Sequence, residues 1–194
     1  MSDTVQRALE ALARHNGAAW LVLVFCGGVL VYLLSLAWLG VALRRLRSVS
    51  WRTVARVVAL GVLAVVGSKV LTHVIIDPRP YLVTHTRPLI PTSHGNGFPS
   101  DHTLLAAALT ASLWWIDRRW LGAFALGTLL VLLGRLGVGA HHTLDVAGSV
   151  AVAGGAALVV GALPLPASWR TPLLPAPGRG QGRRPERPRH RIGR

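Results

Sequence analysis

Long apolar segments separated by short polar ones make up most of this 194-residue chain. A helix needs about 20 apolar residues to cross a hydrocarbon core of roughly 30 Å. Five segments approach or exceed that length, at residues 18–43, 54–76, 103–116, 120–138 and 144–163. The third is short and reaches full length only if its flanking residues lie at the two interfaces, where tryptophan is favoured. The pattern predicts an all-α integral membrane protein, a bundle of about five transmembrane helices.

The segment before the first span has a different pattern. Val5, Leu9 and Leu12 recur at helical spacing among charged residues, which is typical of an amphipathic helix lying on the membrane surface. The segment lacks the basic start and the small-residue cleavage site of a signal peptide, so we expect it to be retained. We assign residues 1–17 to this amphipathic helix and residues 18–164 to the transmembrane bundle.

The remaining residues, 165–194, form a tail rich in proline, glycine and arginine, without apolar periodicity. Such a composition predicts a disordered segment that is attracted to anionic lipid headgroups. Nucleic-acid binding is the alternative for a basic tail. We expect no specific nucleic-acid partner, because arginine-rich segments beside membrane spans usually fix topology and contact lipids.

The composition agrees with a membrane protein. Hydrophobic residues make up 52% of the chain and charged residues 14%, whereas about a quarter of the residues in soluble domains are charged. The net charge of +14 comes almost entirely from arginine, since Lys69 is the sole lysine. Cys26 is the single cysteine, so the chain has no intrachain disulfide, and we expect it to be a small core or lipid-facing residue.

The arginines are distributed unevenly among the loops. They crowd the segment after the first span, the connection at residues 117–119 and the tail. With five spans these three segments share one side of the membrane, which the positive-inside rule assigns to the cytoplasm. The N-terminus, the loop at residues 77–101 and the turn at residues 139–142 are then expected on the external side.

Unusual polar residues gather on this external side. Two prolines flank Arg79 after the second span and hold its backbone extended. Ser100 or Asp101 can cap the third span, whose N-terminus offers free N–H groups to an anion. Later segments bring further ionisable groups to the same side: His102, Arg135, His141 and Asp145.

These residue types are suited to chemistry at phosphorus. The guanidinium groups of Arg79 and Arg135 match the oxygens of a phosphate. A neutral histidine attacks phosphorus when its other nitrogen donates to a carboxylate, and a second histidine protonates the leaving oxygen. The chain has no carboxylate cluster suited to magnesium and no Cys/His spacing typical of structural zinc. We predict phosphoryl transfer through a phosphohistidine, with no metal and no cofactor.

The order and spacing of these residues resemble the signature of the type 2 phosphatidic acid phosphatase superfamily. That signature has three parts: Lys, six residues, Arg-Pro; Pro-Ser-X-His; and Ser-Arg, five residues, His, three residues, Asp. The resemblance covers residues 69–145, and the matching positions are Arg79-Pro80, Pro99-Ser100-Asp101-His102, Arg135, His141 and Asp145.

The resemblance implies a role for each matching residue. His141 would be the nucleophile, Asp145 would orient it, and His102 would be the acid for the leaving group. The phosphoryl oxygens would be bound by Arg79, Arg135 and Ser100.

Two positions depart from the signature. The lysine expected seven residues before Arg79 is Thr72. Lys69 lies one turn earlier on the same helical face and is our candidate to supply that charge as a phosphate-binding residue. The serine expected before Arg135 is Gly134, which removes a hydroxyl.

The resemblance implies an integral membrane lipid phosphatase. The Phe-Pro-Ser-Asp-His form resembles bacterial undecaprenyl pyrophosphate phosphatases, so we expect hydrolysis of this polyprenyl pyrophosphate at the outer face of a bacterial cytoplasmic membrane. Hydrolysis of phosphatidic acid or phosphatidylglycerophosphate is the first alternative. A non-catalytic member that binds or transports lipid phosphates is the second, motivated by Thr72 and Gly134. The remaining histidines that we considered are expected to be surface or interfacial residues: His73, His85, His94 and His142.

Overall fold

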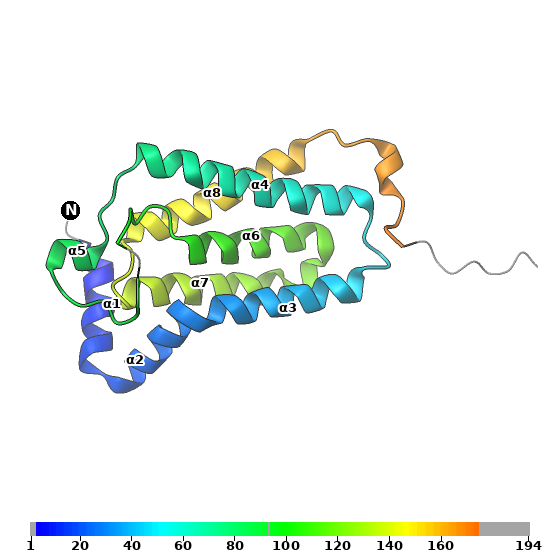
Figure 1. Ribbon diagram of the computed structural model, residues 1–194. Helices are drawn as coiled ribbons and strands as arrows, with labels where there is room; N and C mark the ends of the chain where they lie inside the picture. The colour runs from blue at the N-terminus through cyan, green and yellow to red at the C-terminus, as the bar shows by residue number, and fades with distance from the viewer. Residues whose placement is uncertain (1–2, 93, 175–194) are drawn as a thin grey trace, which may run out of the picture.

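A computed structural model describes residues 3–92 and 94–174 of the chain. Within this part the regular structure is helical and no strand is present. Figure 1 shows long helical segments running side by side along one axis, with the short helix α1 (Thr4–His15) lying across one end. The long segments are α2 (Gly17–Val24) continued by the π-helix η1 (Phe25–Val29) and α3 (Leu30–Arg45), then α4 (Trp51–Val74), α6 (Asp101–Ile116), α7 (Leu121–Gly137) and α8 (Thr143–Ala162).

Helix α6 is the centre of the bundle. It packs against α3, α4, α7 and α8, and its residues Ala106 and Leu113 are fully buried. Four other helical segments are long and apolar enough to cross a membrane, at residues 17–45, 51–74, 118–137 and 143–162. The 16 residues of α6 fall short of that length. The prediction of an all-α membrane bundle is confirmed, with its short third span enclosed by the other four.

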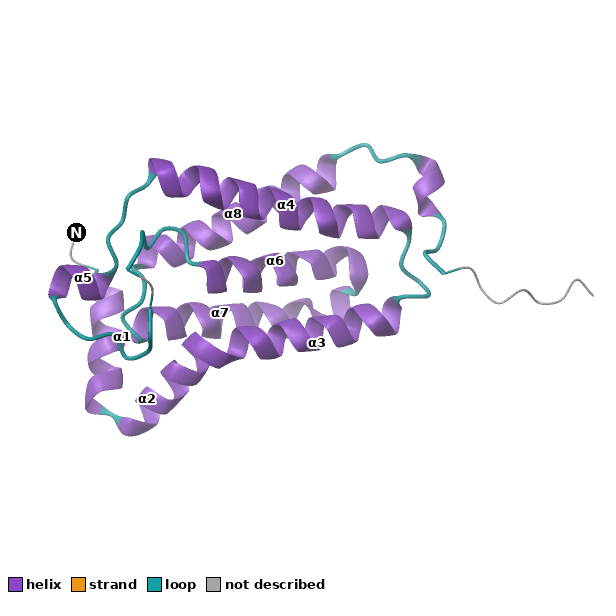
Figure 2. Cartoon of the chain, in the orientation of Figure 1, coloured by secondary structure: helices purple, strands orange, loops and turns teal. Residues whose placement is uncertain are grey.

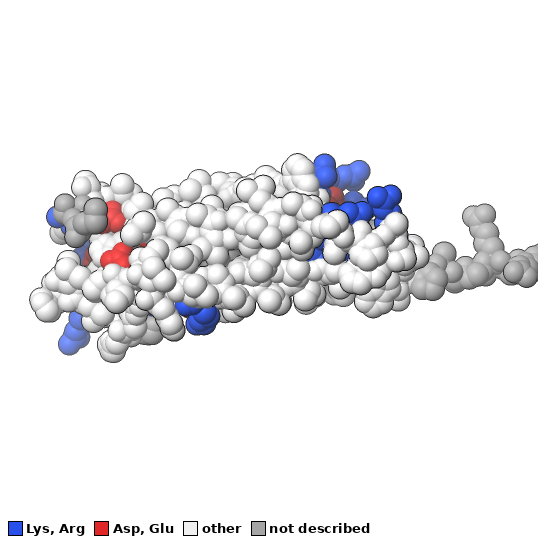
Figure 3. All heavy atoms as spheres, turned by 90° about the horizontal axis from the view of Figure 1, so that it is seen from above, with Lys and Arg blue, Asp and Glu red and all other residues white. Residues whose placement is uncertain are grey.

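The outer faces of the bundle are apolar. Leu36, Val66 and Leu158 are among the large hydrophobic side chains that point away from the protein, and Leu158 is 78% exposed. Figure 3 shows most of the Lys and Arg gathered at one end of the molecule, a few more toward the other end and a largely uncharged surface between them. This arrangement suits a protein whose sides contact lipid and whose ends contact water. The helices meet at these ends through loops, as Figure 2 shows.

The arginine-rich end is fixed by one salt bridge and a short helical turn. Arg45, at the end of α3, lies 2.6 Å from the carboxylate of Asp117. Asp117 precedes the 3-10 helix η2 (Arg118–Trp120), which leads into α7. The guanidinium of Arg118 stacks 4.0 Å above the ring of Trp114. The contacts hold the ends of α3, α6 and α7 together.

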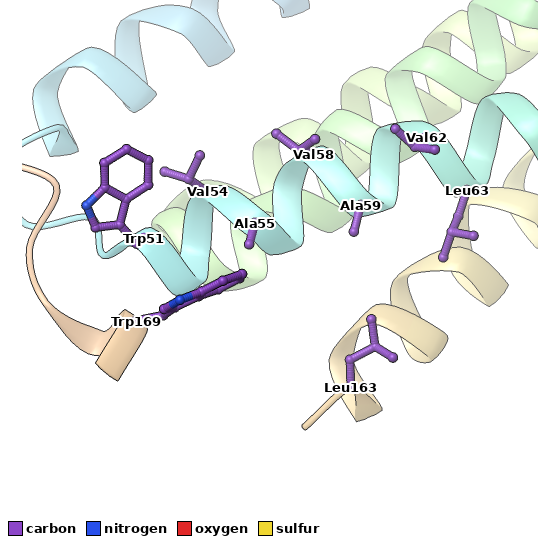
Figure 4. Close-up of a pocket in the computed structure, with 9 residues that line it drawn as sticks. All are labelled: Trp51, Val54, Ala55, Val58, Ala59, Val62, Leu63, Leu163 and Trp169. Atoms are coloured by element: carbon purple, nitrogen blue, oxygen red, sulfur yellow. The ribbon is translucent and has the colours of Figure 1, made fainter. Parts of the chain in front are cut away.

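An apolar groove of about 910 Å³ runs beside α4 at this end (Figure 4). Val58 and Leu63 of α4 line it, together with Leu163 after α8 and the ring of Trp169. None of its lining side chains is ionisable. The groove therefore belongs to the lipid-facing surface and not to the phosphate chemistry.

The start of the tail differs from our prediction of disorder from residue 165 onward. Residues Ala167–Arg170 form the 3-10 helix η3, and the N–H of Leu173 donates to the carbonyl of Val49 at 2.8 Å. The side chain of Leu173 is partly buried in an apolar groove beside α4, and the ring of Trp169, 43% exposed, borders a second groove. The hydrogen bond to Val49 and the contact of Leu173 hold this segment against the bundle. Residues 175–194, the rest of the predicted tail, lie outside the described residues.

The predicted amphipathic helix at the N-terminus is present as α1. Asp3 caps it by accepting a hydrogen bond from the N–H of Gln6. Gln6 and Ala13 are buried against the bundle, whereas Val5 and Leu12 on the opposite side are half exposed. Val5 and Leu12 thus lie on the outward side of α1, where a membrane surface favours apolar side chains.

Candidate active site

The loop between α4 and α6 is tied to the end of α4 by one amide side chain. The amide nitrogen of Asn96 donates to the carbonyls of Thr72 and Ile75 at 2.9 and 2.6 Å. Its oxygen accepts from the N–H groups of Asp77 and Phe98 at 2.8 and 3.3 Å. The last carbonyls of a helix lack partners within the helix. Asn96 therefore stabilises the end of α4 and fixes the start and the end of the loop together.

Arg79 lies within this loop, just before the short helix α5 (Pro80–Thr84). Its backbone is extended, with φ −58° and ψ 148°, as the flanking prolines predict. The side chain is buried, and its Nη1 donates to the carbonyl of Ala140 at 3.2 Å and lies 3.3 Å from Nε2 of His141. The loop thus delivers one guanidinium group to the turn between α7 and α8.

A second guanidinium group comes from the last turn of α7. Arg135 is buried, and its Nη1 donates to the carbonyl of Gly27 at 3.0 Å. Its Nη2 lies 3.2 Å from Nε2 of His141. Gly27 belongs to the π-helix η1, a type of helical irregularity that is frequent at functional sites. The first span therefore orients Arg135 through a backbone carbonyl.

The ring of His141 is held by both of its nitrogens. Nδ1 lies 2.9 Å from the carbonyl oxygen of Gly97 and 3.3 Å from Oδ2 of Asp145. Because the carbonyl of Gly97 can only accept a hydrogen bond, we assign the proton to Nδ1. Nε2 then carries the lone pair and faces the guanidinium groups of Arg79 and Arg135.

The surroundings of His141 favour its neutral form. Burial lowers its pKa well below the ordinary value of 6.5, and the charges of Arg135 and Arg79 lower it further. The hydrogen bond to Gly97 acts in the opposite direction and does not compensate. The ring is therefore an unprotonated imidazole at neutral pH, which is the form that attacks phosphorus.

Asp145 and Gly97 complete the support of the His141 ring. Asp145 is fully buried in the first turn of α8, and its Oδ2 accepts from the N–H of His142 at 2.8 Å. A Cβ on Gly97 would lie 2.8 Å from that same oxygen and 2.9 Å from the carbonyl of Asp77. Only glycine fits this position. Our sequence reasoning did not single out Gly97, because a carbonyl that accepts a hydrogen bond has no signature in the sequence.

One cavity of about 450 Å³ brings four predicted residues together: Arg79, His102, Arg135 and His141. His102 is the second residue of α6, and its ring meets that of Tyr32 edge-on, with 6.2 Å between centroids. Tyr32 and Val29 of the first span form an apolar wall of the cavity. Sequence reasoning missed this contribution, since both residues lie within an uninterrupted apolar run.

Ser100 and Lys69 do not line this cavity. Ser100 is fully buried at the N-cap of α6, where its hydroxyl accepts from Thr103 at 3.3 Å. Lys69 lies on an exposed face of α4. The hydroxyl of Thr72, at the position where the signature has lysine, instead lies 3.2 Å from the carbonyl oxygen of Phe98. The structure does not place either predicted phosphate ligand in the cavity.

The other departure from the signature, Gly134, has a packing reason. A Cβ on Gly134 would lie 2.2 Å from the backbone nitrogen of Gly27, and a Cβ on Gly27 would lie 2.8 Å from the carbonyl of Gly134. The two glycines let the π-helix and α7 approach each other closely. Serine does not fit between these backbones.

The histidines expected outside the chemistry do not line the cavity: His73, His85, His94 and His142. His142 is the N-cap of α8, and its Nε2 lies 3.9 Å from a carboxylate oxygen of Asp77. Within residues 3–92 and 94–174, no group of three or more His, Cys, Asp or Glu side chains is arranged to hold a metal ion.

Comparison with protein families matches residues 52–167 to the PAP2 superfamily. The chain belongs to the PAP2 superfamily. The match includes the positions of the cavity from Arg79 to His141. Among curated proteins, this PAP2 chain is 28% identical over 153 residues to the undecaprenyl-diphosphatase BcrC of Bacillus subtilis (strain 168), covering 79% of each chain. No solved structure matches the sequence.

Membership confirms the resemblance that the sequence pattern indicated. The PAP2 chain is a phosphatase, and its long apolar helices are those of a multi-pass membrane protein.

Proposed function

We propose that this PAP2 phosphatase hydrolyses a polyprenyl diphosphate, with undecaprenyl diphosphate as the first candidate, through a phosphohistidine on His141. One observation carries the mechanism. The unprotonated Nε2 of a neutral, buried imidazole lies 3.2 and 3.3 Å from two guanidinium nitrogens. A nucleophile and two phosphate ligands thus converge on one position.

In the first step the terminal phosphate takes the place between the ring and the guanidinium groups. Arg79 and Arg135 donate to its non-bridging oxygens, and Nε2 of His141 attacks phosphorus. The bond to the bridging oxygen breaks. His102, which takes up a proton when the negative charge of the bound diphosphate offsets the positive charge of Arg79 and Arg135, gives this proton to the oxygen as the lipid monophosphate leaves. We assign phosphate binding to the two arginines, since Ser100 and Lys69 do not line the cavity.

The second step releases inorganic phosphate. Once Nε2 is bonded to phosphorus, the ring is cationic, and the carbonyl of Gly97 and the carboxylate of Asp145 near Nδ1 stabilise it. His102, now neutral, takes a proton from a water molecule that attacks phosphorus. The P–N bond then breaks and the imidazole of His141 is restored.

The choice of lipid rests on the similarity to an undecaprenyl-diphosphatase and on the apolar wall formed by Tyr32 and Val29. Phosphatidic acid and phosphatidylglycerophosphate are the alternatives. A non-catalytic role is less well supported. The absence of serine at Gly134 has a packing reason, and the nucleophile geometry is intact despite Thr72.

The test is phosphate release by the purified full-length protein in detergent, with His141→Ala as the blank. We expect kcat/KM for undecaprenyl diphosphate to exceed that for phosphatidic acid and phosphatidylglycerophosphate by roughly tenfold or more. We expect activity to persist in excess chelator. Activity confined to the glycerophospholipids would contradict the substrate, and loss of activity with chelator would contradict the metal-free mechanism.

A further inference from the structure

A carboxylate from the N-terminus of the sequence reaches the turn that carries His141. Oδ1 of Asp3 accepts from the N–H of Gln6 at 3.0 Å and from the hydroxyl of Thr143 at 2.9 Å. Oδ2 of Asp3 accepts from the backbone N–H of Thr143. Thr143 is the first residue of α8 and follows His141 by two positions. Asp3 therefore caps two helices at once, its own helix α1 and the helix that begins at the active site.

The electrostatics of Asp3 favour its charged form. Burial raises its pKa, but the hydrogen bonds from Gln6 and Thr143, together with the nearby ring of His142, outweigh burial and hold the pKa below the usual value. A carboxylate that accepts backbone N–H groups at a helix start also interacts favourably with the helix dipole. The negative charge of Asp3 thus stabilises the first turn of α8.

Two further contacts hold α1 against the same end of the bundle. Nη2 of Arg14 donates to the carbonyl of Arg87 in the loop between α5 and α6 at 2.7 Å. The carboxylate of Glu10 accepts from Arg14 and lies beside Gly139, where a Cβ would be 3.1 Å from that carboxylate. Gly139 has a φ of +72°. The turn between α7 and α8 is therefore bordered by α1 on one side and by the Asn96–Gly97 loop on the other.

The first turn of α8 matters because it carries the group that orients the nucleophile. Asp145 is the third residue of α8, and its Oδ2 accepts from the N–H of His142. A shift of the helix start would therefore move His141 and Asp145 together, away from the positions set by Gly97 and the two arginines. Misplacement of reacting groups by about 1 Å costs on the order of a hundredfold in rate.

We propose that Asp3 is a positioning residue for the phosphatase reaction: by capping α8 through Thr143, it holds the nucleophile turn in its reactive place. This rests on the proposed function in one respect, that His141 is the nucleophile. Helix α1, which lies across the end of the bundle in Figure 1, is then a structural part of the active site.

The experiment compares caps at the two ends of the molecule in the full-length protein. Asp3→Ala removes the double cap, and Asp3→Asn keeps one acceptor oxygen. The matched control is Ser50→Ala, because Ser50 caps α4 at the arginine-rich end by accepting from the N–H of Thr53. The measurements are kcat, KM, the thermal unfolding midpoint and amide hydrogen exchange of residues 138–147.

We expect Asp3→Ala to lower kcat on the order of tenfold with little change in KM. The substitution loosens the turn that carries His141, whereas the two arginines that bind phosphate keep their positions. Exchange in residues 138–147 should rise. Asp3→Asn should lie between Asp3→Ala and the parent protein, since its amide oxygen still accepts one hydrogen bond. Ser50→Ala should lower the thermal unfolding midpoint by about as much as Asp3→Ala does, and it should leave kcat unchanged.

Unchanged kcat in Asp3→Ala, or an equal loss in Ser50→Ala, would overturn the proposal. Unchanged exchange in residues 138–147 would overturn it as well, and this readout is independent of the reaction. If Asp3→Ala does not fold, the same measurements on Asp3→Asn test the proposal. His141→Ala is assayed alongside. Full turnover in that variant would refute the nucleophile assignment, whereas the exchange data would still decide whether Asp3 fixes the turn.

Discussion

The ring of His141 is surrounded by protein groups that define both its tautomer and its charge. Gly97 and Asp145 accept at Nδ1, and two arginines approach Nε2. Protonation of Nε2 would place a third positive charge beside Arg79 and Arg135 in a buried site, which is unfavourable. The same arrangement favours attack on a phosphate, whose negative charge is opposite to that of the arginines.

We predict that the ring of His141 is still neutral at pH 6.5, where an ordinary histidine is half protonated. Burial and the two arginines lower its pKa well below 6.5, so protons are not taken up near that value. The measurement is the ¹⁵N chemical shift of the ring nitrogens in histidine-labelled protein, with His141→Ala to assign the signals. A transition of His141 near pH 6.5 would contradict the geometry described for its two nitrogens.

The lowered pKa of His141 also makes the stability of the folded protein depend on pH. Below about pH 6.5 the unfolded chain binds a proton at His141 that the folded protein does not bind. The contribution of the neutral ring to stability is therefore present above the unfolded-state pKa and is lost progressively as the pH falls below it.

At the scale of elements, the active site depends on the close contact between η1 and α7. Gly27 and Gly134 face each other without side chains, and the carbonyl of Gly27 holds Arg135 at 3.0 Å. A π-helical turn places its carbonyls differently from an α-helix. The first span thus holds Arg135, a proposed phosphate ligand, in place although it carries no residue of the family signature.

We predict that Gly134→Ser, which restores the serine of the signature, lowers activity by roughly a hundredfold. The new Cβ would meet the backbone of Gly27 at 2.2 Å, so η1 and α7 must move apart and Arg135 moves with them. The matched control is Gly122→Ala on the same helix, where a Cβ meets nothing within 4 Å. Parent-like turnover of Gly134→Ser, or an equal loss in Gly122→Ala, would contradict this account.

The helices were predictable from the sequence, and their irregularities were not. A lipid environment requires continuous apolar runs, so the spans are visible in the hydropathy pattern. The π-helical turn at Phe25–Val29 has the same apolar pattern as the α-helices around it. The site residues of the signature were predictable because they are ionisable groups in an apolar chain. Asn96 and Asp3 bind backbone groups of distant segments, Gly97 acts through its own carbonyl, and no local pattern reports such contacts.

Lys69 shows that helical spacing alone does not predict which way a side chain projects. It lies one turn from Thr72, but it projects from an exposed face of α4. Thr72 faces the loop and lies near the carbonyl of Phe98. The direction of a side chain around a helix follows from its neighbours in space, and those neighbours come from the loop between α4 and α6.

At the scale of the whole molecule, the cavity and the arginine-rich end lie at opposite ends of the bundle. Arg45 ends α3 and Arg118 follows α6 at the arginine-rich end, whereas Arg79 precedes α5 and His141 lies just before α8 at the other end. Figure 1 shows these helix ends at opposite ends of the bundle. The positive-inside rule assigns the arginine-rich end to the cytoplasm. We therefore propose that the cavity opens toward the external leaflet.

Cysteine accessibility tests this orientation. Cys26 is the single cysteine of the chain and is buried, so Cys26→Ser gives a background without thiols. On it, Thr86→Cys reports on the cavity end and Ser48→Cys on the arginine-rich end, because both positions are exposed. We predict that a membrane-impermeant maleimide labels Thr86→Cys in intact cells and labels Ser48→Cys only after permeabilisation. The reverse pattern would show the opposite orientation.

The central claim is that His141, and not a neighbouring histidine, attacks phosphorus. The most direct measurement is the initial rate of phosphate release from undecaprenyl diphosphate by His141→Ala and by His142→Ala, adjacent positions on one turn. We predict that His141→Ala loses at least about a thousandfold in kcat, because the covalent route is removed. His142→Ala should retain at least roughly a tenth of the parent rate, since it loses only part of a helix cap. Equal losses in the two variants, or substantial turnover by His141→Ala, would contradict the account.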